Sequence, residues 1–207
     1  MQRRLILCLA LLTASPLTWA GKQAEEQLSA SVQASLQRSI ADKASPEPIF
    51  ASAEEKALWL NEMSSRLARR LPDARERTDL LKTVYYEAQR AGLDPQLVLG
   101  LIEVESGFKK YAVSSAGARG FMQVMPFWVR QIGTEDQNLF HLRTNLRYGC
   151  TILRHYLDIE KGDLFRALGR YNGSLGRAEY PNMVRGAWEK KWSYNRPASA
   201  ISSTAQR

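Results

Sequence analysis

The sequence predicts a mainly α-helical globular domain, and three features of the 207-residue chain lead to this expectation. The length suits one domain of ordinary size with tails, but not two large domains. The composition is typical of a globular protein, with 44% hydrophobic and 24% charged residues. Helix start and stop signals recur along the chain, strand patterns are scarce, and no internal repeat is visible.

The first twenty residues predict a secretory signal peptide. Arg3 and Arg4 form a positively charged start, residues 5–12 are apolar, and small residues precede a cleavage site after Ala20. The apolar run is too short for a membrane span, so an uncleaved anchor is the less favoured alternative. Cys8 lies too early, inside the apolar run, to serve as a lipidation site. We therefore expect an exported product without stable membrane insertion after cleavage.

The net charge is basic and leaves several partners open. Removal of residues 1–20, which contain two arginines and no acidic residue, would lower the formal net charge from +8 to +6. A basic protein suits an anionic polymer, but also nucleic acid or an anionic membrane surface. No long Lys/Arg block and no nucleic-acid-binding motif is present, so we expect no nucleic-acid partner.

Cysteine and histidine usage argues against a thiol enzyme and against a metal site. After signal cleavage the chain keeps only Cys150, which continues a helical apolar pattern and is expected to be a buried small hydrophobe. A catalytic thiol would need a paired histidine, and His155 falls off the helical face of Cys150. Clusters of Cys and His with ligand spacing are missing, so we expect no metal and no cofactor.

The chain divides into four segments. After the signal peptide, residues 21–75 form an N-terminal arm with one or two helices, of which residues 21–51 are expected to be a mobile leader or loosely packed. Ser52 followed by Glu55 is a capping-box pattern that predicts a helix to about Arg70. Residues 76–193 form the main domain, and residues 194–207 are expected to be a disordered tail.

Start and stop signals place the remaining helices. Leu81, Val84, Tyr85 and Ala88 form one apolar stripe that ends before Gly92. Asp94-Pro95 begins the next helix, since Asp caps helices well and Pro fits their first turn. A Gly/Ser-rich loop is expected over 109–120, and further helices over 126–133, 145–157, 163–171 and 182–191.

The main catalytic candidate is Glu105. Val98, Leu101 and Ile102 define an apolar face of a buried helix, and the next residue on that face is Glu105. Partial burial removes water from the charged carboxylate and should raise its pKa, as a general acid requires near neutral pH. The alternative is that Glu105 merely emerges at the rim of the domain. Periodicity alone does not separate the two interpretations.

Two further features indicate a cleft beside this carboxyl group. Glycines at 107, 117 and 120 allow close approach of backbone to a ligand. A second apolar stripe ends at Tyr171, and polar Asn172 follows at once. The alternative is that Tyr171 belongs to the core and Asn172-Gly173 is an ordinary turn.

Several short motifs in one order resemble the lytic transglycosylase family of the soluble (SLT) type, related to goose-type lysozyme. The resemblance covers about residues 80–190 and rests on Glu105-Ser106, Ala112-Val113-Ser114, Gly117-Ala118, Gly120-Phe121-Met122-Gln123, Val124-Met125-Pro126, Asn145 with Gly149, and Tyr171-Asn172. A lone Glu-Ser pair carries no weight, whereas the whole ordered set is highly specific.

Two positions depart from the family pattern. Phe121 stands where the family usually has Leu. In Glu179-Tyr180-Pro181-Asn182-Met183-Val184, Met183 stands where some members have Tyr. The second departure puts the role of that position in doubt.

The resemblance implies a lysozyme-like helical fold and an enzyme that acts on peptidoglycan. The predicted signal peptide places it in the periplasm, and we expect a monomer. Glu105 would serve as general acid and then as base in cutting the bond between N-acetylmuramic acid and N-acetylglucosamine, leaving a 1,6-anhydro end without water. By the same analogy Ser106 would orient Glu105, Met122 would keep it dry, and Gln123 would contact the acetamido group. Tyr171 would bond Glu105 or the reacting sugar, and Asn172 would hold the cleft.

Three other functions remain open from sequence. A hydrolytic lysozyme would need a second acid, for which Asp94, Glu103 and Glu179 are candidates. A peptidoglycan-binding module would have no need for the buried acid. A structural role in an envelope complex, with residues 21–75 docking partners, is compatible with catalysis.

Overall fold

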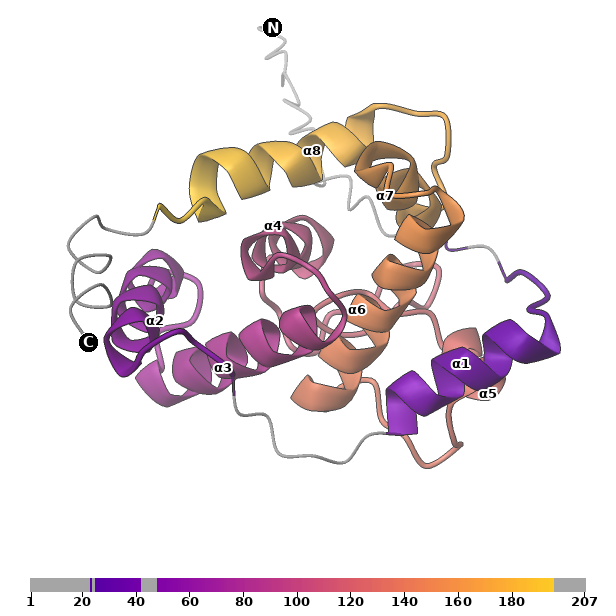
Figure 1. The fold of residues 1–207 in the computed structure, drawn as a ribbon, viewed down its shortest axis with the longest axis horizontal. Coiled ribbons are helices and arrows are strands. Elements are labelled where there is room, and N and C mark those ends of the chain that lie inside the picture. The colour runs from indigo at the N-terminus through magenta and orange to yellow at the C-terminus, as the bar shows by residue number, and fades with distance from the viewer. Residues whose placement is uncertain (1–22, 24, 42–47, 196–207) are drawn as a thin grey trace, which may run out of the picture.

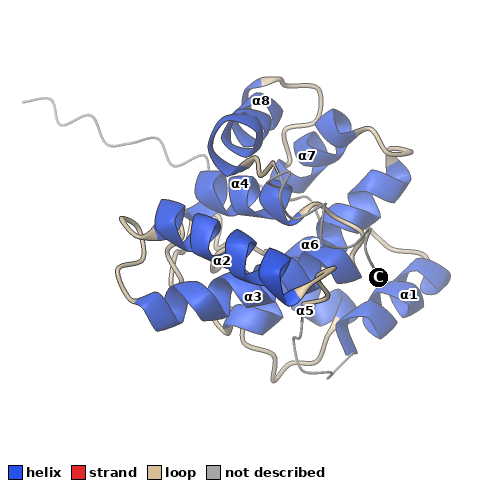
Figure 2. Cartoon of the chain, turned by 60° about the vertical axis from the view of Figure 1, so that its left-hand side comes forward, coloured by secondary structure: helices blue, strands red, loops and turns tan. Residues whose placement is uncertain are grey.

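The computed structural model describes residues 23, 25–41 and 48–195, and over these residues the fold is all-helical. It contains eight α-helices and a short π-helical turn, with no strand longer than isolated bridges in the described part (Figures 1 and 2). The expected signal peptide and most of the tail lie outside these residues. None of the described helices is long and apolar enough to span a membrane.

Local capping residues set the first helices of the main domain. Helix α2 (Ala53–Leu67) begins at Ser52, whose side chain accepts the backbone N–H of Glu55 at 3.0 Å. Helix α3 (Ala74–Arg90) begins at Asp73 in the same way. Such caps satisfy backbone donors that the first helical turn leaves unpaired. Helix α2 therefore starts where the sequence predicts, and ends three residues before the expected Arg70.

Helix α4 (Pro95–Ser106) is the centre of the fold. It lies between α3 and the C-terminal helix α8 (Glu179–Ala187), as Figure 1 shows. A Cβ on Gly100 would stand 2.8 Å from the backbone nitrogen of Trp188, so this glycine permits the close approach. Gly107 ends α4 in the left-handed conformation, with φ of 57°.

The remaining helices close around this centre. Helices α5 (Phe127–Ile132), α6 (Leu142–Ile159) and α7 (Leu164–Asn172) carry the other side of the core, and the π-helical turn η1 (Trp188–Trp192) follows α8 directly. Cys150 of α6 is buried and free, as expected, and burial raises the pKa of its thiol. The helix predicted over 182–191 corresponds to two elements in the structure, α8 and η1. Tyr194, which follows them, packs against the core.

The N-terminal arm packs on the domain more closely than the sequence indicated. Helix α1 (Ala30–Ala41) lies against α5 and α6 and buries Leu36 and Ile40. The Trp128 indole donates to the side-chain oxygen of Gln23 at 2.9 Å, and Gln33 donates to the backbone oxygen of Gln131 at 2.7 Å. Where we expected a mobile leader or a loosely packed arm over 21–51, the structure thus has a helix with two buried residues. Of its three large apolar residues, Leu36 and Ile40 lie in the core and Val32 is partly buried against it.

A buried ion cluster joins α3 to α6. The side chain of Glu87 is fully buried, and its carboxylate contacts Arg147 at 2.8 Å, Arg90 at 3.0 Å and Arg143 at 3.7 Å. A carboxylate removed from water is costly unless charged or hydrogen-bonding partners compensate it, and here three arginines do so. Glu87 thus holds the two helices in one arrangement.

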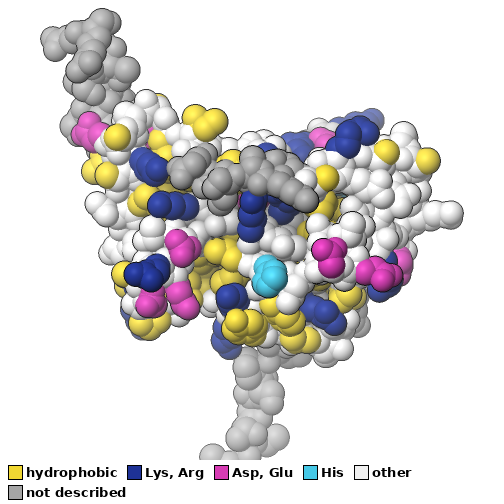
Figure 3. All heavy atoms as spheres, turned by 90° about the horizontal axis from the view of Figure 1, so that it is seen from below, with side chains coloured by type: hydrophobic (Ala, Val, Ile, Leu, Met, Phe, Trp, Pro, Cys, Tyr) yellow, Lys and Arg dark blue, Asp and Glu magenta, His cyan; other side chains and the backbone are white. Residues whose placement is uncertain are grey.

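The surface opposite α8 carries charged side chains of both signs. Figure 3 shows Lys and Arg side chains there mixed with Asp and Glu side chains and with hydrophobic groups. The excess positive charge of the chain is therefore not gathered on this face.

Candidate active site

A groove of about 850 Å³ lies over the C-terminal end of α4. Three parts of the chain line it: the end of α4, the following loop with Gln123, and the exposed side of α8 and η1. The lining residues are Glu103 to Gly107, Lys109, Ala112 to Ser114, Gln123, Asn182, Met183, Gly186, Ala187, Lys190 and Lys191. Glu105 and Ser106, which the sequence analysis singled out, thus both line a concave site.

The carboxyl group of Glu105 is poised to hold a proton. The residue is partly accessible from the groove, but its Oε2 atom is inaccessible to solvent and has no hydrogen-bond partner among the described residues. Loss of hydration destabilises the charged form and raises the pKa of Glu105 to about 8, against its ordinary value of 4.5. A hydrogen bond from Tyr180 partly opposes this rise. Glu105 is therefore protonated at neutral pH.

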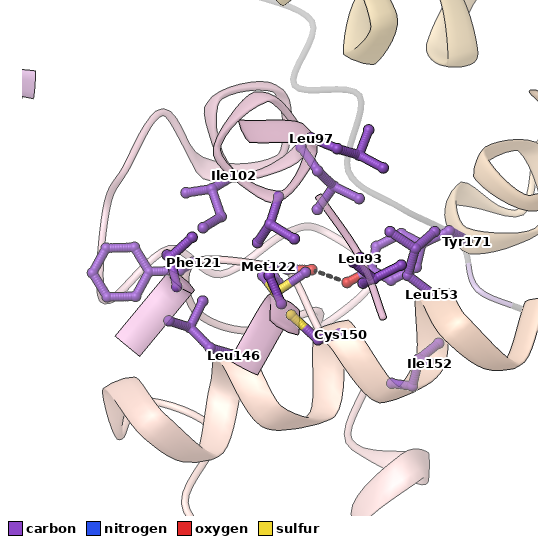
Figure 4. Packing of buried hydrophobic residues seen from close by; sticks show 14 of the residues in the cluster. Leu93, Leu97, Ile102, Phe121, Met122, Leu146, Cys150, Ile152, Leu153 and Tyr171 are labelled. Atoms are coloured by element: carbon purple, nitrogen blue, oxygen red, sulfur yellow. Dashed lines mark hydrogen bonds between the residues drawn. The ribbon is translucent and has the colours of Figure 1, made fainter. Parts of the chain in front are cut away.

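Tyr180 makes the bond to Glu105 that was one of the two contacts expected of Tyr171, the other being to the reacting sugar. Its hydroxyl donates to Oε1 of Glu105 at 2.5 Å, and the side chain is fully buried. The Tyr171 hydroxyl instead donates to the backbone oxygen of Met122 at 2.7 Å (Figure 4). The expected bond from Tyr171 to Glu105 is thus absent from the contacts of the described residues. The reason is that α7 directs Tyr171 beneath the loop, whereas α8 lies over α4.

The loop that carries Met122 and Gln123 is fixed from below. Asn145 of α6 accepts the backbone N–H of Met122 at 2.8 Å and donates to the backbone oxygens of Arg119 and Leu139. Together with the Tyr171 hydroxyl, this side chain satisfies buried backbone groups that a loop otherwise leaves unpaired. The pair Tyr171-Asn145 therefore positions the loop.

Gln123 lines the groove, but its amide nitrogen donates its hydrogen bonds within the loop. It donates to the backbone oxygens of Gly120 at 2.9 Å and Ala112 at 3.1 Å, and its own backbone has a φ of 48°. A positive φ is costly for a residue with a side chain and persists only where the surroundings impose it. The amide oxygen accepts no hydrogen bond from the described residues.

The sequence profile of the family described as the Transglycosylase SLT domain matches residues 82–192, which is just over half of the chain. The chain belongs to the SLT domain family. The matched range contains Glu105, the groove-forming loop, and α8 with Tyr180.

Individual relatives match shorter stretches. A transglycosylase of Enterobacteria phage PRD1 is 32% identical over 99 residues, covering 48% of this chain and 36% of that protein. Membrane-bound lytic murein transglycosylase C of Actinobacillus pleuropneumoniae is 59% identical over 39 residues, 19% of this chain and 11% of that protein. The chain spans about a third or less of these relatives.

Among solved structures, the lytic transglycosylase Slt of Pseudomonas aeruginosa, in an inactive mutant form, is 27% identical. The superposition covers 62% of this chain and 20% of the Slt chain, with a TM-score of 0.43.

The other predicted residues of this SLT domain support the site from behind. Ser106 donates to the backbone oxygens of Phe121 at 2.7 Å and Ile102 at 3.2 Å, so it ties α4 to the loop and does not bond Glu105. Met122 is fully buried beneath the groove, and Asn172 is buried at the end of α7. Neither is among the residues that line the groove.

The three candidate second acids of the SLT domain have other roles. Asp94 caps the opposite end of α4, where it accepts the backbone N–H of Gln96, and Glu179 is exposed. Glu103 does line the groove, but its carboxylate is held by three donors. These are Arg70 at 2.6 Å, Lys191 at 2.6 Å and the Trp192 indole at 2.6 Å.

Sequence reasoning missed Tyr180 and the groove lysines. A signal for Tyr180 was present. Some family members have a tyrosine at the position of Met183, and Tyr180 lies one helical turn earlier, on the same face of the helix. Lys109, Lys190 and Lys191 carried no such signal, since exposed lysines are common on any helical surface. Among the described residues, no group of His, Cys, Asp and Glu could hold a metal ion.

Gly149 makes room for the loop of the SLT domain. A Cβ at this position of α6 would stand 2.3 Å from the Met122 sulfur and 2.7 Å from its Cβ. We expect Gly149→Ala to lower the free energy of unfolding by about 1–3 kcal/mol, since the buried Met122 has little space to move. Urea unfolding measures this change.

Gly186→Ala is the matched control for Gly149→Ala. Nothing lies within 4 Å of a Cβ added to this helical glycine. It should be neutral or stabilising by up to about 1 kcal/mol, because alanine favours helix over glycine. Equal losses in the two variants would show that Gly149 has no special packing role.

Proposed function

We propose that this chain is a peptidoglycan lytic transglycosylase with Glu105 as its single catalytic acid and base. The observation that carries the proposal is the partly buried carboxyl of Glu105, with its raised pKa, on the floor of a groove in an SLT domain. A general acid with a pKa near the working pH can hold and release its proton efficiently.

In the first step Glu105 donates its proton to the oxygen that links N-acetylmuramic acid to N-acetylglucosamine. The bond from that oxygen to the muramic C1 breaks, and the N-acetylglucosamine portion leaves as an alcohol. Positive charge develops at C1 and is met by the 2-acetamido group of the substrate. Tyr180 donates to Oε1 and so stabilises the carboxylate that forms on Glu105.

In the second step the Glu105 carboxylate takes the proton of the muramic 6-hydroxyl. The 6-oxygen then attacks C1 and closes the 1,6-anhydro ring, while Glu105 regains its proton. No water is consumed. Burial of Oε2 supports this course, because it keeps bulk water away from the acid.

A hydrolytic lysozyme is the second candidate, since Glu103 lies in the same groove. A hydrolase with two acids needs a carboxylate free to direct water. Glu103 is engaged by Arg70, Lys191 and Trp192, which favours the single-acid reaction.

The two reactions are distinguished by digesting purified sacculi in ¹⁸O-labelled water and measuring the masses of the muropeptides by mass spectrometry. We expect anhydro ends that are lighter by one water and carry no label. Reducing ends that carry ¹⁸O would contradict the proposal and establish hydrolysis.

The fall in turnover on the alkaline side of the pH–rate profile, its alkaline limb, should reflect the loss of the Glu105 proton. Because the acid must be protonated, turnover should fall as pH rises through about 8. Tyr180→Phe removes a hydrogen bond that lowers the pKa of Glu105, so the limb should move to higher pH. Rate measurements over roughly pH 5–10 test this.

Tyr171→Phe is the control for Tyr180→Phe. It also removes one buried tyrosine hydroxyl, but that hydroxyl donates to Met122 and not to Glu105. The limb should stay in place in this variant. A shift with Tyr171→Phe and none with Tyr180→Phe would reverse the assigned roles.

We further propose that residues 1–20 direct export and that the enzyme acts as a monomer in the periplasm. N-terminal sequencing of the protein recovered from a periplasmic extract tests cleavage after Ala20. The close packing of α1 on the domain supports a stabilising role for the arm, with envelope partners confined to its exposed side.

A further inference from the structure

We propose that Lys109 and Lys190 bind carboxylates of the peptide stem on muramic acid, so that this chain prefers peptide-bearing glycan to stripped glycan. The inference rests on the proposed function and names the part of the substrate that the groove distinguishes.

The groove has an excess of positive charge. Lys109, Lys190 and Lys191 line it, against the two carboxyl groups of Glu103 and Glu105. Glu105 is protonated at neutral pH, and the charge of Glu103 is offset by Arg70 and Lys191. Lys109 and Lys190 are therefore the cations in the groove whose charge no described carboxylate balances within ion-pair distance.

These lysines come from two segments that are held in fixed positions. Lys109 lies just after α4, and its backbone N–H donates to the backbone oxygen of Ser106 at 3.2 Å. Lys190 lies in η1, where the flanking Lys191 and Trp192 both bond Glu103, and Trp192 packs against Phe108 with ring centroids 5.3 Å apart. A carboxylate between the two segments would meet two lysines carried on backbone that is already held in place, which lowers the cost of binding.

The depth of the groups favours the stem peptide as the source of the carboxylates. The Glu105 carboxyl lies deep, with Oε2 inaccessible, while Lys109 and Lys190 are exposed. A sugar ring must reach Glu105 for its bond to be cut, so groups near the exposed lysines are those that project away from the ring. In peptide-bearing glycan the lactyl carboxyl is an amide without charge, and the negative charges lie further out, on the peptide.

The test compares two substrates, peptide-bearing strands and strands whose peptides an amidase has removed. The readout is the ratio of kcat/KM for anhydro-end formation on the two. We expect a ratio of about ten in the wild type and a ratio near one in the double variant Lys109→Met with Lys190→Met, a tenfold change that two exposed ion pairs allow. Added salt should reduce the wild-type ratio, since it screens exposed charges.

Lys110→Met is the matched control. Lys110 is adjacent to Lys109 and equally charged, but its ammonium lies over the Tyr111 ring and does not line the groove. It should keep the wild-type ratio. An unchanged ratio in the double variant would overturn the proposal, including the case in which both substrates lose equally because the lysines attract glycan in general.

Binding without turnover separates this proposal from the proposed function. Glu105→Gln can be sedimented with intact and with amidase-stripped sacculi, with and without the two lysine changes. Loss of preference for intact sacculi on changing the lysines supports the stem-peptide site even if no cleavage is ever observed. Equal binding to both kinds of sacculi before the lysines are changed contradicts it.

Discussion

Glu105→Gln should fold normally and lose glycan cleavage by a factor on the order of 10²–10⁴, the usual contribution of general acid–base catalysis. The amide keeps the shape of the side chain and can still accept the hydrogen bond from Tyr180 at Oε1. It has no proton to transfer, so both steps of the proposed reaction fail. The measurement is the rate of anhydro-end formation from sacculi.

The control for this variant is Glu103→Gln. It changes a carboxyl on the same helix that lines the same groove but is bound by Arg70, Lys191 and Trp192. We expect a smaller loss of activity. Near-normal turnover by a folded Glu105→Gln protein, with loss in Glu103→Gln, would transfer the catalytic role to Glu103.

The raised pKa of Glu105 also has a consequence for stability. Between pH 4.5 and about 8 the folded protein holds a proton that the unfolded chain has released. The free energy of unfolding should therefore fall as pH rises through this window, by up to about 1.4 kcal/mol per pH unit. Glu105→Gln lacks this term, so its stability relative to the wild type should rise with pH.

Glu87→Ala should cause the largest loss of stability among the substitutions considered, about 3–5 kcal/mol. It removes the carboxylate that Arg147 contacts at 2.8 Å, and only 5% of the Arg147 side chain is exposed. A buried guanidinium that loses this carboxylate retains its desolvation cost. Denaturant unfolding at neutral pH measures the effect.

Glu62→Ala is the comparison for Glu87→Ala. Glu62 pairs with Arg66 at 2.7 Å, but 47% of its side chain is exposed. Solvent screens such pairs, so the expected loss is at most about 1 kcal/mol. Similar losses in the two variants would mean that Glu87 contributes only as an ordinary surface charge does.

The helices of the main domain were predictable because their signals are local. Helix α4 begins at Asp94-Pro95 and ends at Gly107. Both signals act through contacts within one helical turn, and the structure places the ends of α4 there. Helix α1 carries few apolar residues, and its order depends on contacts of Leu36 and Ile40 with distant helices. A sequence pattern cannot report such contacts.

The site was predictable to the extent that residues near one another in sequence define it. Periodicity placed Glu105 at the end of a buried helix, and the structure puts it on the floor of the groove. The choice between Tyr171 and Tyr180 depends on how α7 and α8 pack against α4, which spacing along the chain does not determine. The groove lysines likewise gain meaning only when η1 is brought beside the end of α4.

The most direct test of the central claim is a ¹³C NMR titration of the Glu105 carboxyl carbon, assigned as the signal that Glu105→Gln lacks. The structure predicts a midpoint at about pH 8, because burial withholds water from the charged carboxylate. A midpoint near the ordinary value of 4.5 would mean that Glu105 is ionised at neutral pH and cannot be the proton donor.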